Sequence, residues 1–230
     1  MQKLIRVAVD AMGGDNAPAE IVKGAVEALK ASTDLKVILV GQEEAVQQEL
    51  SKYQYDASRM EVVNATEIIE MAEPPVQAIR SKKDSSIVVA MKLVKNGEAD
   101  AFVGAGSTGA VLVGGQLIVG RLKGVERPPL APLLPTEKGA SLLIDCGANV
   151  DARPSHLVQF AKMGSIYMEN VMGVKNPRVA IVNIGAEEEK GNALVKETFP
   201  LLKACQDIIH FKDYQSYTDS SFCITLQKEP

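Results

Sequence analysis

The sequence predicts an α/β protein with a mostly parallel sheet. Short apolar runs recur along its 230 residues, amphipathic helical patterns separate most of these runs, and polar loops that contain glycine follow several of them. Strands that alternate with helices pair in parallel, and the helices cover both faces of the sheet. Because 46% of the residues are hydrophobic, the chain has enough apolar side chains for one large domain or two closely joined ones.

Strand and helix patterns alternate regularly in the first half of the chain. Apolar runs predict strands, and apolar residues at helical spacing predict helices. The predicted strands are residues 5–9, 35–40, 60–63 and 101–103, and the predicted helices are residues 18–31, 43–52, 76–80, 87–94 and 110–119. Asp84 and Ser85 are candidate N-caps of the fourth helix, which ends at Asn96 and Gly97.

The second half begins with a different pattern. The proline spacing in residues 128–136 excludes a helix, and an apolar strand over residues 140–145 follows the turn 137–139, which predicts a local antiparallel hairpin. Further along, the patterns predict a helix over 156–172, a strand over 178–184 and a helix over 192–202. Repeats, low-complexity tracts and obvious linkers are absent from the sequence.

Composition excludes several classes of function. A net charge of −4 and few aromatic residues argue against nucleic-acid binding. Apolar runs are too short to span a bilayer and the N-terminus has a strand pattern, so we expect an intracellular protein. Neither the cysteines (Cys146, Cys205, Cys223) nor the histidines (His156, His210) have the spacing of a metal site, a disulfide framework or a catalytic triad. We therefore expect no metal and no cofactor.

The most informative stretch is Gly104–Ala110, between a predicted strand and a predicted helix. A glycine-rich turn from strand into helix leaves several backbone N–H groups unpaired near the positive end of the helix dipole, which predicts a phosphate site. Ser107 and Thr108 add hydroxyl donors, and glycines let the backbone approach an anion closely. A tight turn with no ligand is the simpler alternative.

The same loop matches G-x-G-x-x-G, which is the pattern of a dinucleotide site. That pattern requires an acidic residue at the end of the second strand, about twenty residues further on. The candidate acid, Glu126, lies in a turn instead. A nicotinamide-dependent dehydrogenase is therefore the weaker interpretation.

Three further loops follow predicted strands: residues 10–18, 145–151 and 185–192. The carboxyl ends of parallel strands meet at one edge of a sheet, so these loops and Gly104–Ala110 can converge on one cleft. Each acidic or amide residue in them is, taken singly, more simply a helix cap or turn former. Glu187–Glu189 is most simply a solvated helical turn, and Lys190 is either a phosphate ligand or solvated.

Two basic groups stand out in an acidic chain, residues 80–83 and residues 121–127. Solvated surface is the simpler interpretation of both. As a functional hypothesis, they steer an acidic partner toward the cleft.

Six segments together resemble the bacterial phosphate acyltransferases of phospholipid synthesis, the PlsX family. They are IRVAVDAMGGDNAP, EPPVQAIRSKKDSSIVVA, EADAFVGAGSTGA, LLIDCGANVD, HLVQFAKMGSIY and NPRVAIVNIGAEEEKGN. The likeness extends from Ile5 to about Lys203, whereas residues 204–230 depart from the family's continuation. We therefore expect an acyltransferase core over residues 1–203, incomplete relative to the family, and a divergent tail over residues 204–230.

The resemblance implies an activity and a fold. The implied reaction transfers a fatty acyl group from acyl carrier protein to inorganic phosphate. The implied fold is a three-layer α/β/α sandwich like that of isocitrate and isopropylmalate dehydrogenases. The implied protein is a cytoplasmic homodimer in its full-length form, with peripheral contact at the inner face of the membrane. The alternative is a non-catalytic fragment that binds phosphate or acyl carrier protein without turnover.

Roles in this reaction are hypotheses for named residues. Attack of phosphate on a thioester needs no Ser-His-Asp triad, because the nucleophile is already anionic and a thiolate is a tolerable leaving group. The candidates for binding phosphate or the developing oxyanion are Gly106, Ser107, Thr108 and Gly109. The candidates for orienting the thioester carbonyl are Asn149, Asn183 and Lys190. Asp10 and Asp15 are candidates for ordering the loops, and Gly13 and Gly14 are placed in the same substrate site.

Overall fold

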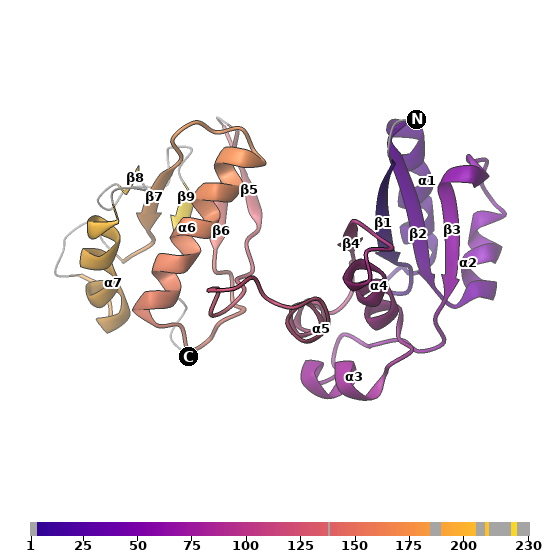
Figure 1. Ribbon diagram of the computed structural model, residues 1–230, viewed down its shortest axis with the longest axis horizontal. Helices are drawn as coiled ribbons and strands as arrows, with labels where there is room; N and C mark the ends of the chain where they lie inside the picture. Colours follow the sequence, from indigo (N-terminus) through magenta and orange to yellow (C-terminus); the bar gives the residue numbers. More distant parts are fainter. Residues whose placement is uncertain (1–3, 138, 185–189, 206–209, 212–221, 225–230) are drawn as a thin grey trace. The chain divides into compact units, whose positions relative to one another are not determined.

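The computed structural model describes residues 4–137, 139–184, 190–205, 210–211 and 222–224 (Figure 1). The chain divides into two compact units, Met1–Arg121 and Leu122–Pro230, and each is described by itself. The predicted boundary after residue 203 remains a prediction.

The first unit is built on a parallel four-stranded sheet. Its strands are β1 (Ile5–Asp10), β2 (Leu35–Gly41), β3 (Met60–Asn64) and β4 (Ala101–Val103), in the order β3-β2-β1-β4. All neighbouring pairs are parallel, and β1 pairs with β4 through the register Val9↔Val103. The loops that follow β1 and β4 are therefore neighbours at the carboxyl edge of the sheet, although they lie far apart in the sequence.

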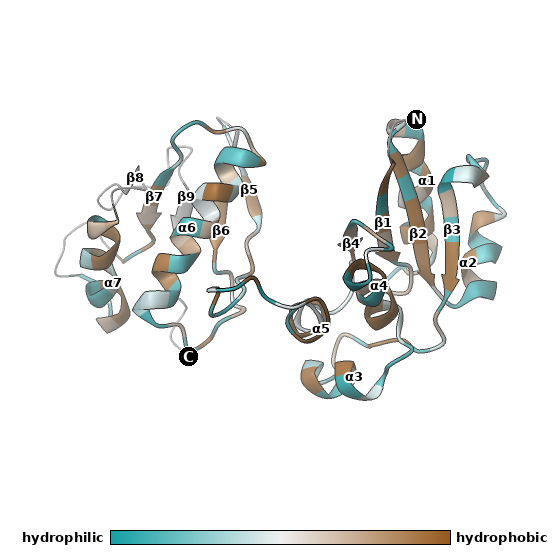
Figure 2. Ribbon diagram, viewed as in Figure 1, coloured by the Kyte–Doolittle hydropathy of each residue, from teal (hydrophilic) through white to brown (hydrophobic). Residues whose placement is uncertain are grey.

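Helices cover both faces of this sheet, as the sequence predicted. Alternate strand residues point to opposite faces: Val37 and Leu39 pack with helices α1 and α2, whereas Ala8 and Ile38 pack with helix α4. Figure 2 shows the hydrophobic residues along β2 and β3 that these helices cover. The helices of this unit are α1 (Ala19–Ala31), α2 (Glu43–Leu50), α3 (Pro75–Ser81), α4 (Ser86–Lys95) and α5 (Thr108–Gly114), with a 3₁₀ turn at Ala57–Arg59 and a π-helical turn at Gly115–Val119.

Neither predicted side-chain cap of α4 forms, although Ser85 is the N-cap residue. Ser85 occupies the N-cap position, but its hydroxyl donates to the carbonyl of Lys82 at 2.9 Å and makes no cap hydrogen bond. The Asp84 carboxylate accepts instead from the backbone N–H of Thr66 at 3.0 Å. Both side chains therefore fasten α4 to the segments before it, which is a tertiary use that local capping preference cannot reveal.

The second unit contains a mixed sheet. Its strands are β5 (Leu133–Thr136), β6 (Gly139–Ile144), β7 (Arg178–Ile181), β8 (His210–Phe211) and β9 (Phe222–Ile224), in the order β5-β6-β9-β7-β8. The predicted antiparallel hairpin is confirmed as β5 and β6, and the other pairs are parallel. β7 ends at Ile181, three residues before the predicted end, and Val182 and Asn183 have no regular secondary structure.

Two helices pack against one face of this sheet, α6 (Pro154–Asn170) and α7 (Ala193–Ala204). Leu142 and Ile144 of β6 lie in one buried cluster with Phe160 of α6 and Leu202 of α7. The side chain of Asn192 caps α7 by accepting from the N–H of Val195 at 3.0 Å. In the part of the chain that the structure describes, none of the helices is long and apolar enough to cross a membrane.

Candidate functional site

The loops after β1 and β4 touch through glycines. A Cβ atom on Gly13 would lie 2.9 Å from the backbone nitrogen of Gly106, and one on Gly106 would lie 3.1 Å from the Cα of Gly13. Gly14 has a φ of +102°, and a Cβ there would lie 3.1 Å from the carbonyl oxygen of Ala105. Contacts this close leave no room for side chains. The structure thus brings together Gly13, Gly14 and Gly106, three of the residues predicted to bind substrate.

Asp10 lies beneath this contact. Its side chain is buried, and its Oδ1 accepts from the N–H of Met12 at 3.1 Å. Its Oδ2 makes no hydrogen bond of good geometry with any described residue. Burial raises the pKa of this carboxyl, and the Ser86 hydroxyl and the amides of Met12 and Gly13 oppose that rise. Asp10 therefore holds the start of this loop through one of its two oxygens.

The glycine-rich loop presents unpaired amides. Within the described chain, the backbone N–H groups of residues 105–109 donate no hydrogen bond, whereas those of Ala110 and Val111 bond to Ser107. Thr108 is exposed, and Ser107 is buried as the N-cap of α5, its Oγ accepting from Ala110 at 3.3 Å. A run of unpaired donors at the carboxyl end of a strand is a place for an anion.

Gly109 is required by a different contact. A Cβ atom on it would lie 2.6 Å from Cγ of Pro75, at the start of α3. Close packing against α3 therefore explains this glycine without a ligand. Asp15, in the loop after β1, is exposed, and α1 begins after Pro18 with no side-chain cap, so the capping role weighed for Asp15 is not observed.

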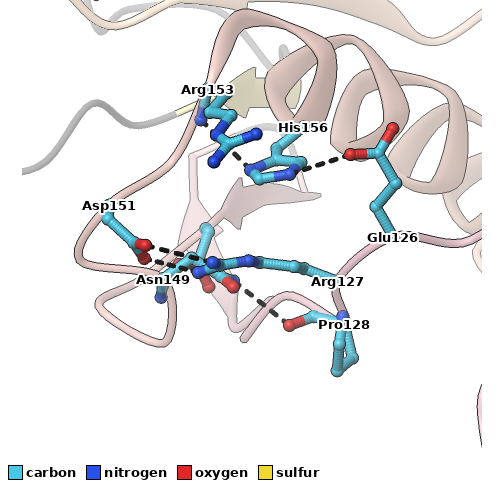
Figure 3. Close-up of polar contacts among 8 residues, drawn as sticks. Glu126, Arg127, Pro128, Asn149, Asp151, Arg153 and His156 are labelled. Carbon is cyan, nitrogen blue, oxygen red and sulfur yellow. Dashed lines mark hydrogen bonds and ion pairs between the residues drawn. The ribbon is translucent and has the colours of Figure 1, made fainter.

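In the second unit, Asn149 fastens the loop after β6. It is buried, and its side-chain Nδ2 donates to Pro128 O at 3.1 Å and to Asp145 Oδ2 at 3.2 Å. The Asn149 backbone N–H donates to the same Asp145 oxygen at 2.7 Å. Asp145 Oδ1 accepts from the N–H of Leu130 at 2.6 Å. Figure 3 shows the Asn149 side chain facing Pro128. The amide of Asn149 is thus engaged in holding two backbone segments together.

Asn183 and Lys190 lie at the two ends of the loop after β7. The Asn183 side chain donates to the Lys190 carbonyl at 3.1 Å, and the Lys190 side chain is exposed. Gly191, with a φ of +99°, makes room for Asn183, because a Cβ there would lie 2.5 Å from Asn183 Oδ1. Residues 185–189 between them, including the helical turn predicted at Glu187–Glu189, lie outside the described residues.

Sequence reasoning missed a polar cluster at the start of α6 (Figure 3). His156 Nδ1 accepts from the N–H of Arg153 at 3.1 Å, and His156 Nε2 lies 3.0 Å from Glu126 Oε2. Arg127 forms a bidentate ion pair with Asp151, which lowers the pKa of the Asp151 carboxyl. The sequence analysis treated Glu126 and Arg127 separately, and no spacing pattern links them to His156 or Asp151.

The second unit contains Asn149, Asn183 and Lys190, and the first unit contains the two glycine loops. The convergence of all four loops on one cleft remains a prediction.

The fold defines a class of α/β proteins that includes phosphotransacetylases. A phosphotransacetylase from Streptococcus pyogenes matches 96% of this chain and 77% of its own with a TM-score of 0.70 at 16% identity. EutD phosphotransacetylase from Staphylococcus aureus matches 94% of this chain and 69% of its own, with a TM-score of 0.64 at 21% identity. A 4-hydroxythreonine-4-phosphate dehydrogenase from Burkholderia phymatum has a TM-score of 0.52 at 14% identity, over 96% of this chain and 80% of its own. These likenesses concern the fold alone, and they confirm the predicted fold class.

The particular family follows from sequence relatives. The profile of the family described as "Fatty acid synthesis protein" matches residues 5–218, and the chain belongs to this family. The chain is 52% identical over 204 residues to a putative phosphate acyltransferase from Clostridium perfringens (strain 13 / Type A), covering 89% of this chain and 60% of that protein. It is 56% identical over 200 residues to the phosphate acyltransferase of Desulfitobacterium hafniense (strain Y51), covering 87% and 59%. The chain thus spans about 60% of the length of these curated relatives.

Proposed function

We propose that this protein is an acyl-[acyl-carrier-protein]:phosphate acyltransferase, which forms acyl phosphate for phospholipid synthesis. The names of the relatives support phosphate acyl transfer, and the family description supports a place in fatty acid metabolism. The structural observation that carries the proposal is the run of unpaired amides over residues 105–109 beside the loop of Gly13. Backbone donors held in place by a sheet stabilise a bound anion and the charge that develops on it.

The proposed reaction balances without a cofactor. A phosphate oxygen attacks the thioester carbonyl carbon, the C–S bond breaks, and the leaving thiolate takes up a proton. The products are acyl phosphate and the thiol of the carrier. The amides of residues 105–109 hold phosphate or the oxyanion, and the Thr108 hydroxyl adds a donor from the exposed side of the loop. Rate enhancement then comes from positioning and charge stabilisation.

The second unit contributes positioning. Asn149 and Asn183 hold their loops through the bonds to Pro128 and Lys190, so we propose that they orient the thioester carbonyl through these loops. Lys190 supplies positive charge from an exposed side chain.

In the first unit, Val76 and Arg80 on α3 line a surface hollow, and this mixture of apolar and cationic groups suits an acidic acyl carrier protein. A cytoplasmic homodimer with peripheral membrane contact completes the proposal.

A proline substitution tests the anion site at a single amide. Thr108 is the first residue of α5, where proline is tolerated, and Ser107 before it has φ −59° and ψ 108°, which a following proline accepts. Thr108→Pro removes both the hydroxyl and the N–H, whereas the matched control Thr108→Ala removes only the hydroxyl. A hydrogen bond to a charged group contributes about 1.5–3 kcal/mol, so Thr108→Pro should raise the KM for phosphate roughly 10- to 100-fold relative to Thr108→Ala.

The measurement is acyl phosphate formation from acyl carrier protein thioester over a range of phosphate concentrations. Equal KM values for phosphate in the two variants, with equal unfolding midpoints in urea, would remove this loop from the phosphate site. Calorimetric phosphate binding separates an enzyme from a binding-only fragment. A chain that binds phosphate but forms no acyl phosphate from the thioester is the fragment.

A further inference from the structure

Within the described part of the chain, Asp10 is a buried acid that forms no ion pair. Its side chain is 1% exposed at the carboxyl end of β1. One oxygen accepts from Met12, and the other, Oδ2, is shielded from solvent and makes no hydrogen bond of good geometry with any described residue. An ionised carboxylate in such a place loses its hydration and regains little of it, whereas a neutral carboxyl loses much less.

The described groups that lie closest to Asp10 are uncharged. Its own loop contributes the amides of Met12 and Gly13, and α4 contributes the buried hydroxyl of Ser86. The loop after β4 contributes the backbone of Gly106. Burial is the largest influence on the pKa of Asp10, and the hydrogen bonds with Ser86, Met12 and Gly13 act against it. The Ser86 hydroxyl can donate to a carboxylate or accept from a neutral carboxyl, so it accommodates either form.

Oδ2 occupies the space between the two glycine loops. A Cβ atom on Gly13 would lie 2.3 Å from Oδ2, and one on Gly106 would lie 3.4 Å from it. The Gly106 amide also belongs to the run of unpaired donors at residues 105–109. A negative charge on Oδ2 would therefore lie beside the donors that the proposed function assigns to phosphate, and like charges that share a site repel.

We propose that Asp10 is a positioning residue that works as a neutral carboxylic acid, so that the two glycine loops close over an uncharged group and their donors stay available to a phosphate. The part that concerns phosphate rests on the proposed function, whereas the neutral state of Asp10 does not. Burial, which raises the pKa of Asp10, acts in the same direction. Ionisation of Asp10 then weakens both the loop contact and the binding of phosphate.

The first experiment concerns the acid itself. Asp10→Asn keeps the shape and removes the charge, and the control Glu27→Gln removes one charge from the exposed face of α1. Because the folded pKa is raised, the wild type holds its proton more tightly when folded, so its stability falls as pH rises from the unfolded pKa to the folded pKa. Over that window the unfolding constant of the wild type should increase about tenfold per pH unit relative to Asp10→Asn. Glu27→Gln should show no such slope.

Carboxyl ¹³C NMR of the wild-type chain provides a readout that does not depend on any variant folding. A protonated Asp10 carboxyl at pH 7 supports the proposal. An ionised one overturns it, and so does an Asp10→Asn chain that is less stable than the wild type at pH 7.

The second experiment measures the KM for inorganic phosphate in wild type and Asp10→Asn from pH 5 to 9. Phosphate's own titration affects both chains equally, so it cancels in the ratio of the two KM values. Above the pKa of Asp10 this ratio should rise about tenfold per pH unit, with kcat less affected. A constant ratio overturns the positioning role. If neither chain binds phosphate while NMR shows a neutral Asp10, the proposed phosphate site is wrong and the neutral state of Asp10 is right. If Thr108→Pro weakens phosphate binding while Asp10 is ionised, the phosphate site is right and the neutral state of Asp10 is wrong.

Discussion

The loops at strand ends differ between the two units in how many of their polar groups form hydrogen bonds within the described chain. In the first unit, the amides of residues 105–109 and one oxygen of Asp10 have no partner among the described residues. In the second unit, Asn149 and Asn183 are held by bonds to neighbouring backbone. Polar groups bonded within the protein hold the structure together, whereas donors without a partner in the described chain stay available to water or a ligand. This contrast agrees with the proposed function, in which the first unit binds phosphate and the second unit positions the thioester.

The contrast has a topological cause. In the first unit, β1 and β4 are adjacent parallel strands, so two loops meet directly and only glycines fit between them. In the second unit, residues 124–130 run beside the loop after β6 and must be fastened to it by Asp145, Asn149 and the cluster around His156. Side chains used as fasteners have few hydrogen-bonding positions left for a substrate.

The largest expected effect comes from breaking the glycine contact. Gly13→Ala places a Cβ atom 2.3 Å from Asp10 Oδ2 and 2.9 Å from the Gly106 nitrogen. Neither neighbour is the free end of a flexible side chain, so we expect a loss of about 3 kcal/mol in the free energy of unfolding, at the upper end for overpacking. Urea unfolding of the intact chain measures this loss.

Gly24→Ala is the matched control, because Gly24 is exposed in α1 and a Cβ there meets nothing within 4 Å. Replacing glycine by alanine inside a helix should raise stability by about 0.5–1 kcal/mol. If Gly13→Ala behaved like Gly24→Ala, the two loops would not be in contact and the difference between the units would disappear.

A smaller loss is expected in the second unit from Asn149→Ala. The substitution leaves Asp145 Oδ2 with only the backbone N–H of residue 149 and leaves Pro128 O without the side-chain donor of Asn149. Loss of buried hydrogen bonds should lower the free energy of unfolding by about 1–2 kcal/mol. Hydrogen exchange at the Leu130 amide, which donates to Asp145, reports this change locally.

Asn170→Ala serves as the comparison, since that exposed side chain at the end of α6 donates to the carbonyl of Ile166 at 2.9 Å. We expect it to change stability by less than about 0.5 kcal/mol. Phosphate affinity should be retained in Asn149→Ala if the second unit only positions. A loss of phosphate affinity as large as that of Thr108→Pro would mean that both units bind the anion directly.

The sequence predicted the strands and helices well where periodicity and flanking turns agreed, as in β1, β2 and α1. It also predicted the glycine-rich turn that leads from strand β4 into helix α5. The convergence of the loops after β1 and β4 was predicted, but the direct contact of Gly13 with Gly106 was not, because the two glycines lie in loops separated by three strands and four helices. Ser85 is the N-cap residue of α4, as predicted, but the side chains of Asp84 and Ser85 bond to Thr66 and Lys82 and do not cap the helix.

The site in the second unit was predicted by residue type and not by contact. Asn149 and Asn183 stand after strands, as a ligand site requires, but their amides are engaged by Asp145, Pro128 and Lys190. Residue type alone does not distinguish an amide that binds substrate from one that fastens a loop. β9 was also unpredicted, since its short run lies in a tail without helical or strand periodicity around it.

The smallest expected effect is at Asp151, whose pH dependence should have the opposite sign to that of Asp10. The ion pair with Arg127 lowers the pKa of Asp151, and the Asp151 side chain is 73% exposed. A carboxyl with a lowered folded pKa contributes stability above its unfolded pKa of about 3.9, and this contribution is lost as pH falls through the folded pKa. Asp151→Asn should therefore be slightly less stable than wild type at pH 7 and equal to it at low pH, whereas Asp10→Asn should be more stable than wild type at pH 7.

A double-mutant cycle with Arg127→Gln measures the coupling free energy between Asp151 and Arg127, which should fade in about 1 M salt because exposed charges are screened. A coupling free energy that persists in high salt would mean that this pair is shielded from solvent in the folded protein. Asp151 would then hold its loop in place in the same way as the buried Asp145 and Asn149.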